Sequence, residues 1–161
     1  MKLIKKGLAA IKRSQLVDPV EVKRRREVAA GEFMDVLQDH FSKTFESHPA
    51  SLLYAAAWLT GASLFPSFRF PHLPPAGSVV LSDKANDEGL RLLETYFSTL
   101  LEKYRIKVAT ADIIYDIPQE YKPVKDILAV QKLFQHAFVN IMKRQGLDDV
   151  QAAEAGALVC A

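Results

Sequence analysis

Apolar residues along this chain recur mainly three or four positions apart, the spacing that places side chains on one face of an α-helix. The clearest helix start is at Asp18, whose carboxylate can cap the backbone, with Pro19 at the first helical position and Glu21 completing a capping box. We predict a helix that runs to about Phe45, because the residue before Pro49 is disfavoured in a helix. Its expected buried face comprises Ala30, Phe33, Met34, Leu37, Phe41 and Phe45.

The apolar face of this first helix does not extend to the helix start. When it is continued backward at about 100° per residue, it reaches Lys23 and Arg26 instead of further hydrophobic residues. The first turns are therefore expected to project beyond the core, or to pack on something other than this domain.

Residues 51–65 are apolar nearly all round, which predicts a central, buried helix. One side of it carries small residues, among them Thr60, that let a neighbouring helix approach closely. The whole apolar stretch Ala50–Phe65 is 16 residues long. A membrane-spanning helix needs roughly 20 such residues, so no transmembrane segment is predicted.

Two connections without a clear helical pattern follow from the remaining sequence. Prolines and Gly77 enforce a long, Pro-rich loop from Pro66 to about Ser82. The segment Ile106–Ile117 is ambiguous, because its β-branched residues suggest an extended piece whereas Asp112 can cap a short helical turn.

A third amphipathic helix is predicted from Asp83 or Asn86 to Tyr104. Polar residues face away from its apolar stripe, which is the side expected to be buried in a bundle. The stripe consists of Leu90, Leu93, Phe97, Leu100, Leu101 and Tyr104.

The C-terminal part of the chain predicts two more helices. One runs from about Pro123 to Gln145, with Gly146 as its C-cap. Its expected buried side comprises Val124, Ile127, Phe134, Phe138, Ile141 and Met142. Asp148 and Gln151 have the spacing of a capping box for a last helix that reaches Ala161.

The predicted fold is therefore all-α: a bundle of four to five helices with a basic amphipathic N-terminal helix and a long Pro-rich loop. Residues 1–17 are expected to form an N-terminal arm, and residues 18–161 a single helical-bundle domain. With 161 residues, 49% of them hydrophobic and 25% charged, the chain is long and apolar enough to bury a core. The single cysteine, Cys160, excludes an internal disulfide and fits a reducing, cytoplasmic compartment.

Charge is distributed unevenly behind a net value of +2. Residues 1–26 hold nine basic and two acidic side chains, a balance of +7, whereas the remaining residues hold 12 basic and 17 acidic ones, a balance of −5. Such asymmetry indicates an anionic partner for the basic segment. The candidate partner-binding residues are Lys5, Lys6, Lys12, Arg13, Lys23, Arg24, Arg25 and Arg26.

The segment Met1–Arg13 places Ile4, Leu8 and Ile11 on one side, with lysines around them. This pattern is typical of a basic amphipathic helix on a membrane surface or a partner. The stripe can equally dock on this domain or on a second copy of it. The run 23–26 points around almost the whole helix circumference, so a solvated helix surface competes with nucleic-acid or lipid binding there.

Signatures of catalysis and metal binding are missing from the sequence. The four histidines are scattered, no Glu-x-x-His pair exists, and no nucleophile or phosphate-binding motif occurs, so no cofactor and no metal are predicted. The chain also carries no motif that assigns it to a known family. The sequence favours a non-enzymatic function.

Two aromatic groups suggest an alternative function. Tyr54 and Trp58, one turn apart, can wall a pocket for a small apolar ligand under the Pro-rich loop, although core packing explains them too. Phe68 and Phe70 lie in that loop and can line the same pocket, contact a partner, or cover the core.

From these patterns we predict a helical module that docks, or self-associates, through its basic N-terminal arm. The partner is expected to be an acidic protein surface or a second copy of the chain, with nucleic acid or anionic lipid as further options. The alternative is a bundle that binds an apolar ligand beside Tyr54 and Trp58.

Overall fold

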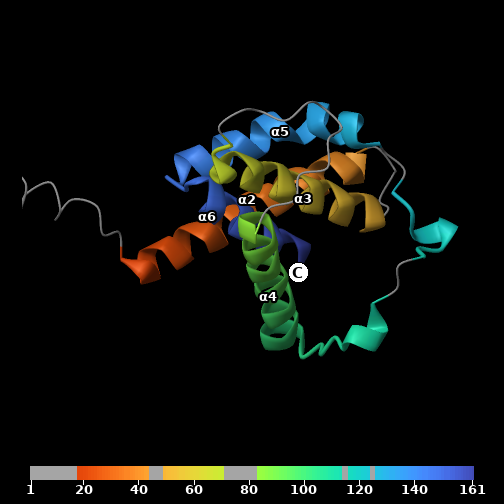
Figure 1. The fold of residues 1–161 in the computed structure, drawn as a ribbon. Helices are drawn as coiled ribbons and strands as arrows, with labels where there is room; N and C mark the ends of the chain where they lie inside the picture. Colours follow the sequence, from red (N-terminus) through yellow and green to blue (C-terminus); the bar gives the residue numbers. More distant parts are fainter. Residues whose placement is uncertain (1–17, 44–48, 71–82, 114–115, 124–125) are drawn as a thin grey trace, which may run out of the picture.

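The computed structural model describes residues 18–43, 49–70, 83–113, 116–123 and 126–161 (Figure 1). These residues form helices and turns without any strand, so the prediction of an all-α fold is confirmed. The helices are α2 (Pro19–Lys43), α3 (Pro49–Leu64), α4 (Asp83–Tyr104), α5 (Ile127–Arg144) and α6 (Asp149–Cys160), with short 3₁₀ turns η1 (Phe65–Phe68), η2 (Thr110–Asp112) and η3 (Gln119–Tyr121).

Two predicted features lie outside these residues. The helix expected at Met1–Arg13, with the rest of the arm to residue 17, is not among them. Of the Pro-rich loop, only the start is described, where η1 continues directly from α3.

Helices α2, α3, α5 and α6 share one hydrophobic core. Phe33 of α2 meets Phe138 of α5 edge to face, with ring centroids 4.8 Å apart. Leu37 and Leu59 are fully buried beside them, and so is Val130, which the predicted buried side of α5 did not include.

Local capping explains where the last two helices begin. The Asp126 carboxylate accepts a hydrogen bond from the Ala129 amide at 2.8 Å, so α5 starts at Ile127. The predicted start near Pro123 is wrong. The predicted capping box of α6 is confirmed, because the Asp148 carboxylate accepts the Gln151 amide and the Gln151 side chain accepts the Asp148 amide. Gly146, between these helices, has a φ of +66°, a conformation that glycine adopts without strain.

The last helix is the central one. In Figure 1, α6 lies behind α4, and it contacts α2, α3 and α4, with its most extensive contact on α3. Its buried residues are nearly all small: Ala152, Ala153, Ala155, Gly156, Ala157 and Val159. Small side chains let the axes of α3 and α6 come close together.

The closest approach is between Gly156 and Thr60 of α3. A Cβ atom built on Gly156 would lie 2.2 Å from Thr60 Oγ1 and 3.1 Å from Thr60 Cβ. The Thr60 hydroxyl is held there, since it donates to the Ala56 carbonyl at 2.8 Å. The small residues expected on α3 thus face the small residues of α6.

We expect Gly156→Ala to lower the free energy of unfolding by about 1–3 kcal/mol, because the new methyl group overlaps the Thr60 hydroxyl. Adding Thr60→Ala should restore part of the loss. The matched control is Gly31→Ala on α2, where an added Cβ meets nothing within 4 Å; it should raise the stability by about 0.5–1 kcal/mol. Urea unfolding measures all three, and a neutral Gly156→Ala would contradict the close contact.

Candidate interaction surface

Most of the apolar stripe of helix α4 is exposed. Leu90, Leu93, Leu101 and Tyr104 are 60%, 52%, 47% and 58% exposed, and Thr99 is the buried residue of this helix. The expectation that the stripe is buried in the bundle is therefore wrong for these four residues, whereas Phe97 and Leu100 are half-buried. Figure 1 shows the lower half of α4 projecting from the other described helices.

The side of α4 that meets α6 has an apolar and a polar part. Gly89, Leu92 and Tyr96 line the hollow that α4 shares with Ala157 and Cys160 of α6, and polar residues lie beside them. Glu154 of α6 is only 14% exposed on its side chain, and its carboxylate lies 3.7 Å from the Arg91 guanidinium. On the same side of α4, Thr99 Oγ1 donates to the Thr95 carbonyl at 2.7 Å. Because these polar groups are satisfied by the ion pair and by the helix backbone, they can be packed at little cost.

The exposed stripe has the spacing of a coiled-coil seam. Leu90, Leu93, Phe97, Leu100 and Tyr104 follow one another at intervals of three, four, three and four residues. This is the a/d pattern that packs along a second helix. An acidic edge runs beside it, because Asp87 and Glu94 both occupy the e position and both are exposed.

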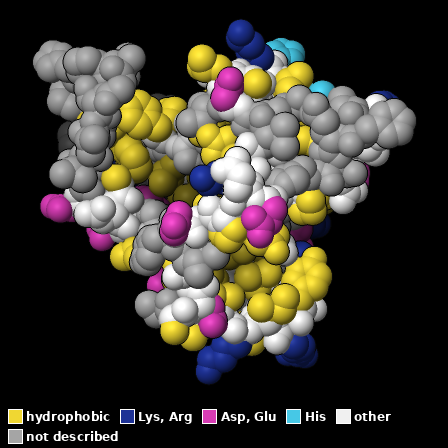
Figure 2. All heavy atoms as spheres, turned by 90° about the vertical axis from the view of Figure 1, so that its right-hand side faces the viewer, with side chains coloured by type: hydrophobic (Ala, Val, Ile, Leu, Met, Phe, Trp, Pro, Cys, Tyr) yellow, Lys and Arg dark blue, Asp and Glu magenta, His cyan; other side chains and the backbone are white. Residues whose placement is uncertain are grey.

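An apolar hollow of about 420 Å³ adjoins the stripe, between α3, α4 and α6. Leu93 belongs to both the hollow and the stripe, and Leu53 of α3 lines the opposite wall. In Figure 2, hydrophobic side chains cover much of the lower part of the visible face, where α4 and the segment after it lie. Together the stripe and the hollow form one continuous apolar surface, which we call the α4 face.

Cys160 lies in the wall of this hollow beside Tyr96. Burial raises the pKa of the Cys160 thiol to about 11. Burial also raises the pKa of Tyr96, with a smaller contribution from the nearby Cys160. Cys160 is therefore a protonated, hydrophobic side chain in the ordinary pH range.

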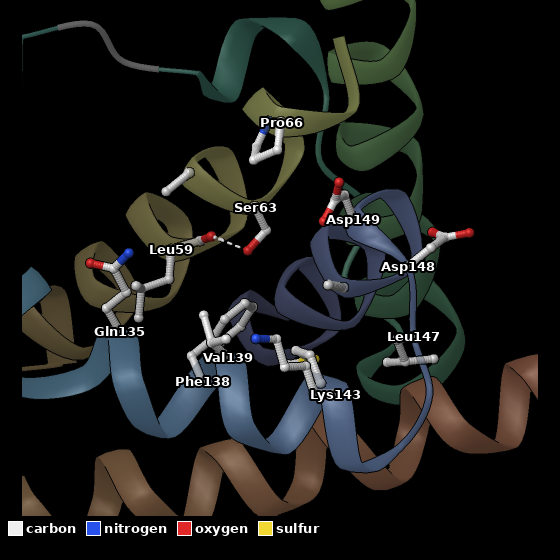
Figure 3. Close-up of a pocket in the computed structure, with 13 residues that line it drawn as sticks. Leu59, Ser63, Pro66, Gln135, Phe138, Val139, Lys143, Leu147, Asp148 and Asp149 are labelled. Atoms are coloured by element: carbon white, nitrogen blue, oxygen red, sulfur yellow. Dashed lines mark hydrogen bonds between the residues drawn. The ribbon is translucent and has the colours of Figure 1, made fainter. Parts of the chain in front are cut away.

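A second hollow, of about 180 Å³, lies between α3, α5 and the start of α6 (Figure 3). Leu59 and Phe138 are apolar residues of its wall, and Lys143 and Asp149 bring charge to it. The Ser63 hydroxyl donates its hydrogen to the Leu59 carbonyl at 2.9 Å, so its oxygen is left as a hydrogen-bond acceptor in the hollow. The volume is below the roughly 300 Å³ at which ligand pockets usually begin.

The structure separates the basic residues that the sequence grouped together. Lys5, Lys6, Lys12 and Arg13 lie outside the described residues. Lys23 lies 4.0 Å from Glu27, and Arg24 and Arg25 both contact Glu21 at 2.8 Å. Hydrogen bonds from Arg24 and then Arg25 lower the pKa of Glu21 to about 2.

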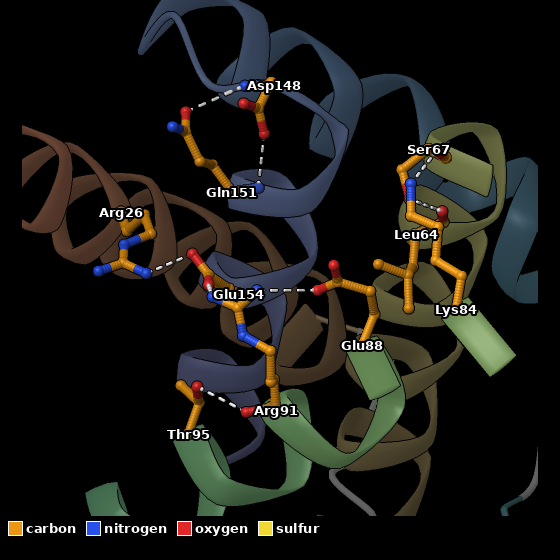
Figure 4. A network of polar contacts seen from close by, with 10 residues as sticks. All are labelled: Arg26, Leu64, Ser67, Lys84, Glu88, Arg91, Thr95, Asp148, Gln151 and Glu154. Carbon is orange, nitrogen blue, oxygen red and sulfur yellow. Dashed lines mark hydrogen bonds and ion pairs between the residues drawn. The ribbon is translucent and has the colours of Figure 1, made fainter. Parts of the chain in front are cut away.

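Arg26 is used inside the fold. Its guanidinium donates to the Glu154 carboxylate, which also faces Arg91, so one acid of α6 joins α2 to α4 (Figure 4). The Arg26 side chain is 24% exposed. The first turns of α2, up to Arg26, thus lie outside the hydrophobic core, as the sequence predicts. Arg26 nevertheless packs on the same domain, through its ion pair with Glu154.

The aromatic residues of the alternative site fall into two groups. Tyr54 and Trp58 are partly buried and pack against the core, and Trp58 also lines a shallow hollow with Phe65. Phe68 and Phe70 cluster around Phe65, with ring centroids 6.3 and 5.4 Å from it. Tyr54 does not line that hollow.

Two searches of the described residues give negative results. No group of three or more His, Cys, Asp or Glu side chains there is arranged to hold a metal ion. None of the helices in that part of the chain has both the length and the apolarity of a membrane span.

A scan against protein-family models matches no family, and searches of the curated proteins and of the solved structures return no match.

We expect Arg26→Gln to destabilise the protein by about 1–3 kcal/mol, because it leaves the half-enclosed Glu154 carboxylate with one cation instead of two. The control Lys23→Gln removes an exposed charge three residues away and should change the stability by less than about 0.5 kcal/mol. Equal effects of the two changes in urea unfolding would show that Arg26 has no structural role.

We also expect Cys160 to react slowly with iodoacetamide. With its pKa at about 11, the thiolate fraction at pH 8 is about 100-fold below that of an ordinary thiol. The rate should keep rising as the pH increases above 9, and mass spectrometry follows the adduct. A native rate equal to that of the denatured chain would contradict the burial of Cys160.

Proposed function

We propose that this chain is a non-enzymatic helical module that binds a protein partner through the α4 face. The observation that carries the proposal is the exposure of the α4 stripe. Leu90, Leu93 and Leu101 are 60%, 52% and 47% exposed, although they belong to the apolar stripe of this helix. A helix arranged in this way presents a seam to a second helix.

The energetics favour an occupied surface. Fully burying one leucine contributes about 1.5–3 kcal/mol, so several half-exposed leucines leave a few kcal/mol available to a binding partner. Stripe and hollow are contiguous through Leu93. Monomeric proteins rarely expose contiguous apolar surface of more than a few hundred Å².

The basic N-terminal arm remains a proposed second contact, with an acidic protein surface, a second copy, an anionic membrane or a nucleic acid. Among the described basic residues near the helix start, Lys23 and Arg24 are exposed and can reach such a partner, whereas Arg26 is engaged by Glu154. The single cysteine supports a reducing compartment, and we propose the cytoplasm.

The alternative, an apolar ligand beside Tyr54 and Trp58, has less support. Tyr54 packs on the core cluster, and the hollow beside Trp58 is a shallow one that Tyr54 does not line. Quenching of the lone tryptophan by an apolar compound would favour this alternative.

A photo-crosslinking residue tests the proposal. In cells that make the protein, p-benzoylphenylalanine in place of Leu101 should give a discrete adduct of higher mass, and in place of the similarly exposed Leu133 of α5 it should not. Leu90→Ser with Leu93→Ser should reduce the adduct by about tenfold or more, since each leucine contributes about 1 kcal/mol.

The matched control is Leu128→Ser on α5, where the leucine is 64% exposed, close to the 60% of Leu90. It should leave the adduct unchanged. Adducts that form equally from positions 101 and 133, or that survive loss of both leucines, would contradict docking at the α4 face.

A further inference from the structure

We infer that in the free protein the α4 face is covered by the chain's own N-terminal segment, Met1–Arg13, packed antiparallel on α4 in the same molecule. The inference rests on the proposed function, because it names what occupies the same surface before a partner does. Two observations support it: the spacing of the apolar residues and the spacing of the charged residues both match between this segment and α4.

The apolar register matches a helical form of this segment to α4. The apolar residues of the segment, Ile4, Leu8 and Ile11, are four and three residues apart. Leu90, Leu93 and Phe97 of α4 are three and four residues apart, which is the same spacing read in the opposite direction. An antiparallel pair aligns a positions with d positions. The layers are then Ile11 on Leu90, Leu8 on Leu93 and Ile4 on Phe97.

The charge register selects the same alignment. Lys5 and Lys12 are seven residues apart, each directly after a d position, and Asp87 and Glu94 are related in the same way on α4. Residues at e face one another in an antiparallel pair, so Lys5 lies opposite Glu94 and Lys12 opposite Asp87.

The two acids are available for this pairing. Neither Asp87 nor Glu94 makes an ion pair with any residue in the described ranges. Arg91 lies between them on the same side of α4, and its charge is taken up by Glu88 at 3.3 Å and by Glu154. The edge therefore presents a negative charge to an incoming lysine.

A second copy of α4 fits the face less well. In the antiparallel pair that aligns Leu93 with Phe97 of the second copy, Glu94 faces Glu94. Like charges at this position oppose association. Charge complementarity thus favours the basic segment over another α4.

Docking in the same molecule requires that the residues between Arg13 and the start of α2 reach from α2 to α4. Arg26 of α2 and Arg91 of α4 share the carboxylate of Glu154, so α2 passes on the side of α4 that carries Arg91 (Figure 4). Arg13 and Pro19 are six residues apart, which allows a span of about 20 Å.

Disulfide trapping tests the inference. In full-length protein with Cys160→Ala, the pair Leu8→Cys and Leu93→Cys should form a disulfide within one chain under mild oxidation. The control pair Leu8→Cys and Leu128→Cys places the second thiol on α5, at a leucine that is 64% exposed against 52% for Leu93, and it should react at least about tenfold more slowly.

Charge reversal separates docking from random encounter. Lys5→Glu with Lys12→Glu should slow formation of the 8–93 disulfide about tenfold, and adding Asp87→Lys with Glu94→Lys should restore it. Lys2→Glu with Lys6→Glu makes the same change in net charge away from the e positions, and it should have little effect.

Three results would overturn the inference: a disulfide between two chains, which identifies the occupant as a second copy; a rate no faster than that of the control pair; or a rate that ignores charge reversal. None of these bears on the adduct formed from position 101, which reports partner binding. The proposed function and this inference therefore fail separately.

Discussion

The separation between α3 and α6 is set by two small groups, the Thr60 hydroxyl and the missing side chain of Gly156. Because these helices nearly touch, α6 can lie at the centre of the fold and contact three others at once. The other buried residues of α6 are also small, most of them alanines. A larger residue on α6 would push apart several helices, so the constraint is shared by the whole core.

That central position also brings one enclosed carboxylate between α2 and α4. Glu154 is the charged residue on the buried stretch of α6, and it requires cations on its neighbours. Arg26 approaches from α2 and Arg91 from α4, so the Glu154 carboxylate joins both helices to α6. The Arg91 side chain is 59% exposed, so it reaches Glu154 from the edge of the contact between α4 and α6.

Local signals in the sequence predicted the helices well, because caps such as Asp148 and stripes such as Phe33–Leu37–Phe41 act within one element. They failed at α4, where amphipathicity predicts burial of leucines that are exposed in the structure. A carboxylate and an arginine that lie far apart in the sequence give no periodic signal. For the same reason, Arg26 was grouped with its basic neighbours, although its partner is Glu154 of a helix that follows more than a hundred residues later.

The central helix has a consequence for the order of folding. Residues of α6 follow α2, α3, α4 and α5 in the chain, yet they provide the surface on which α2, α3 and α4 meet. During synthesis from the N-terminus, the earlier helices therefore emerge before their common neighbour and keep their apolar sides uncovered. Contacts of such long sequence separation slow folding. A nascent chain that ends before Asp149 lacks its organising helix, and it is the species most exposed to aggregation and to chaperones.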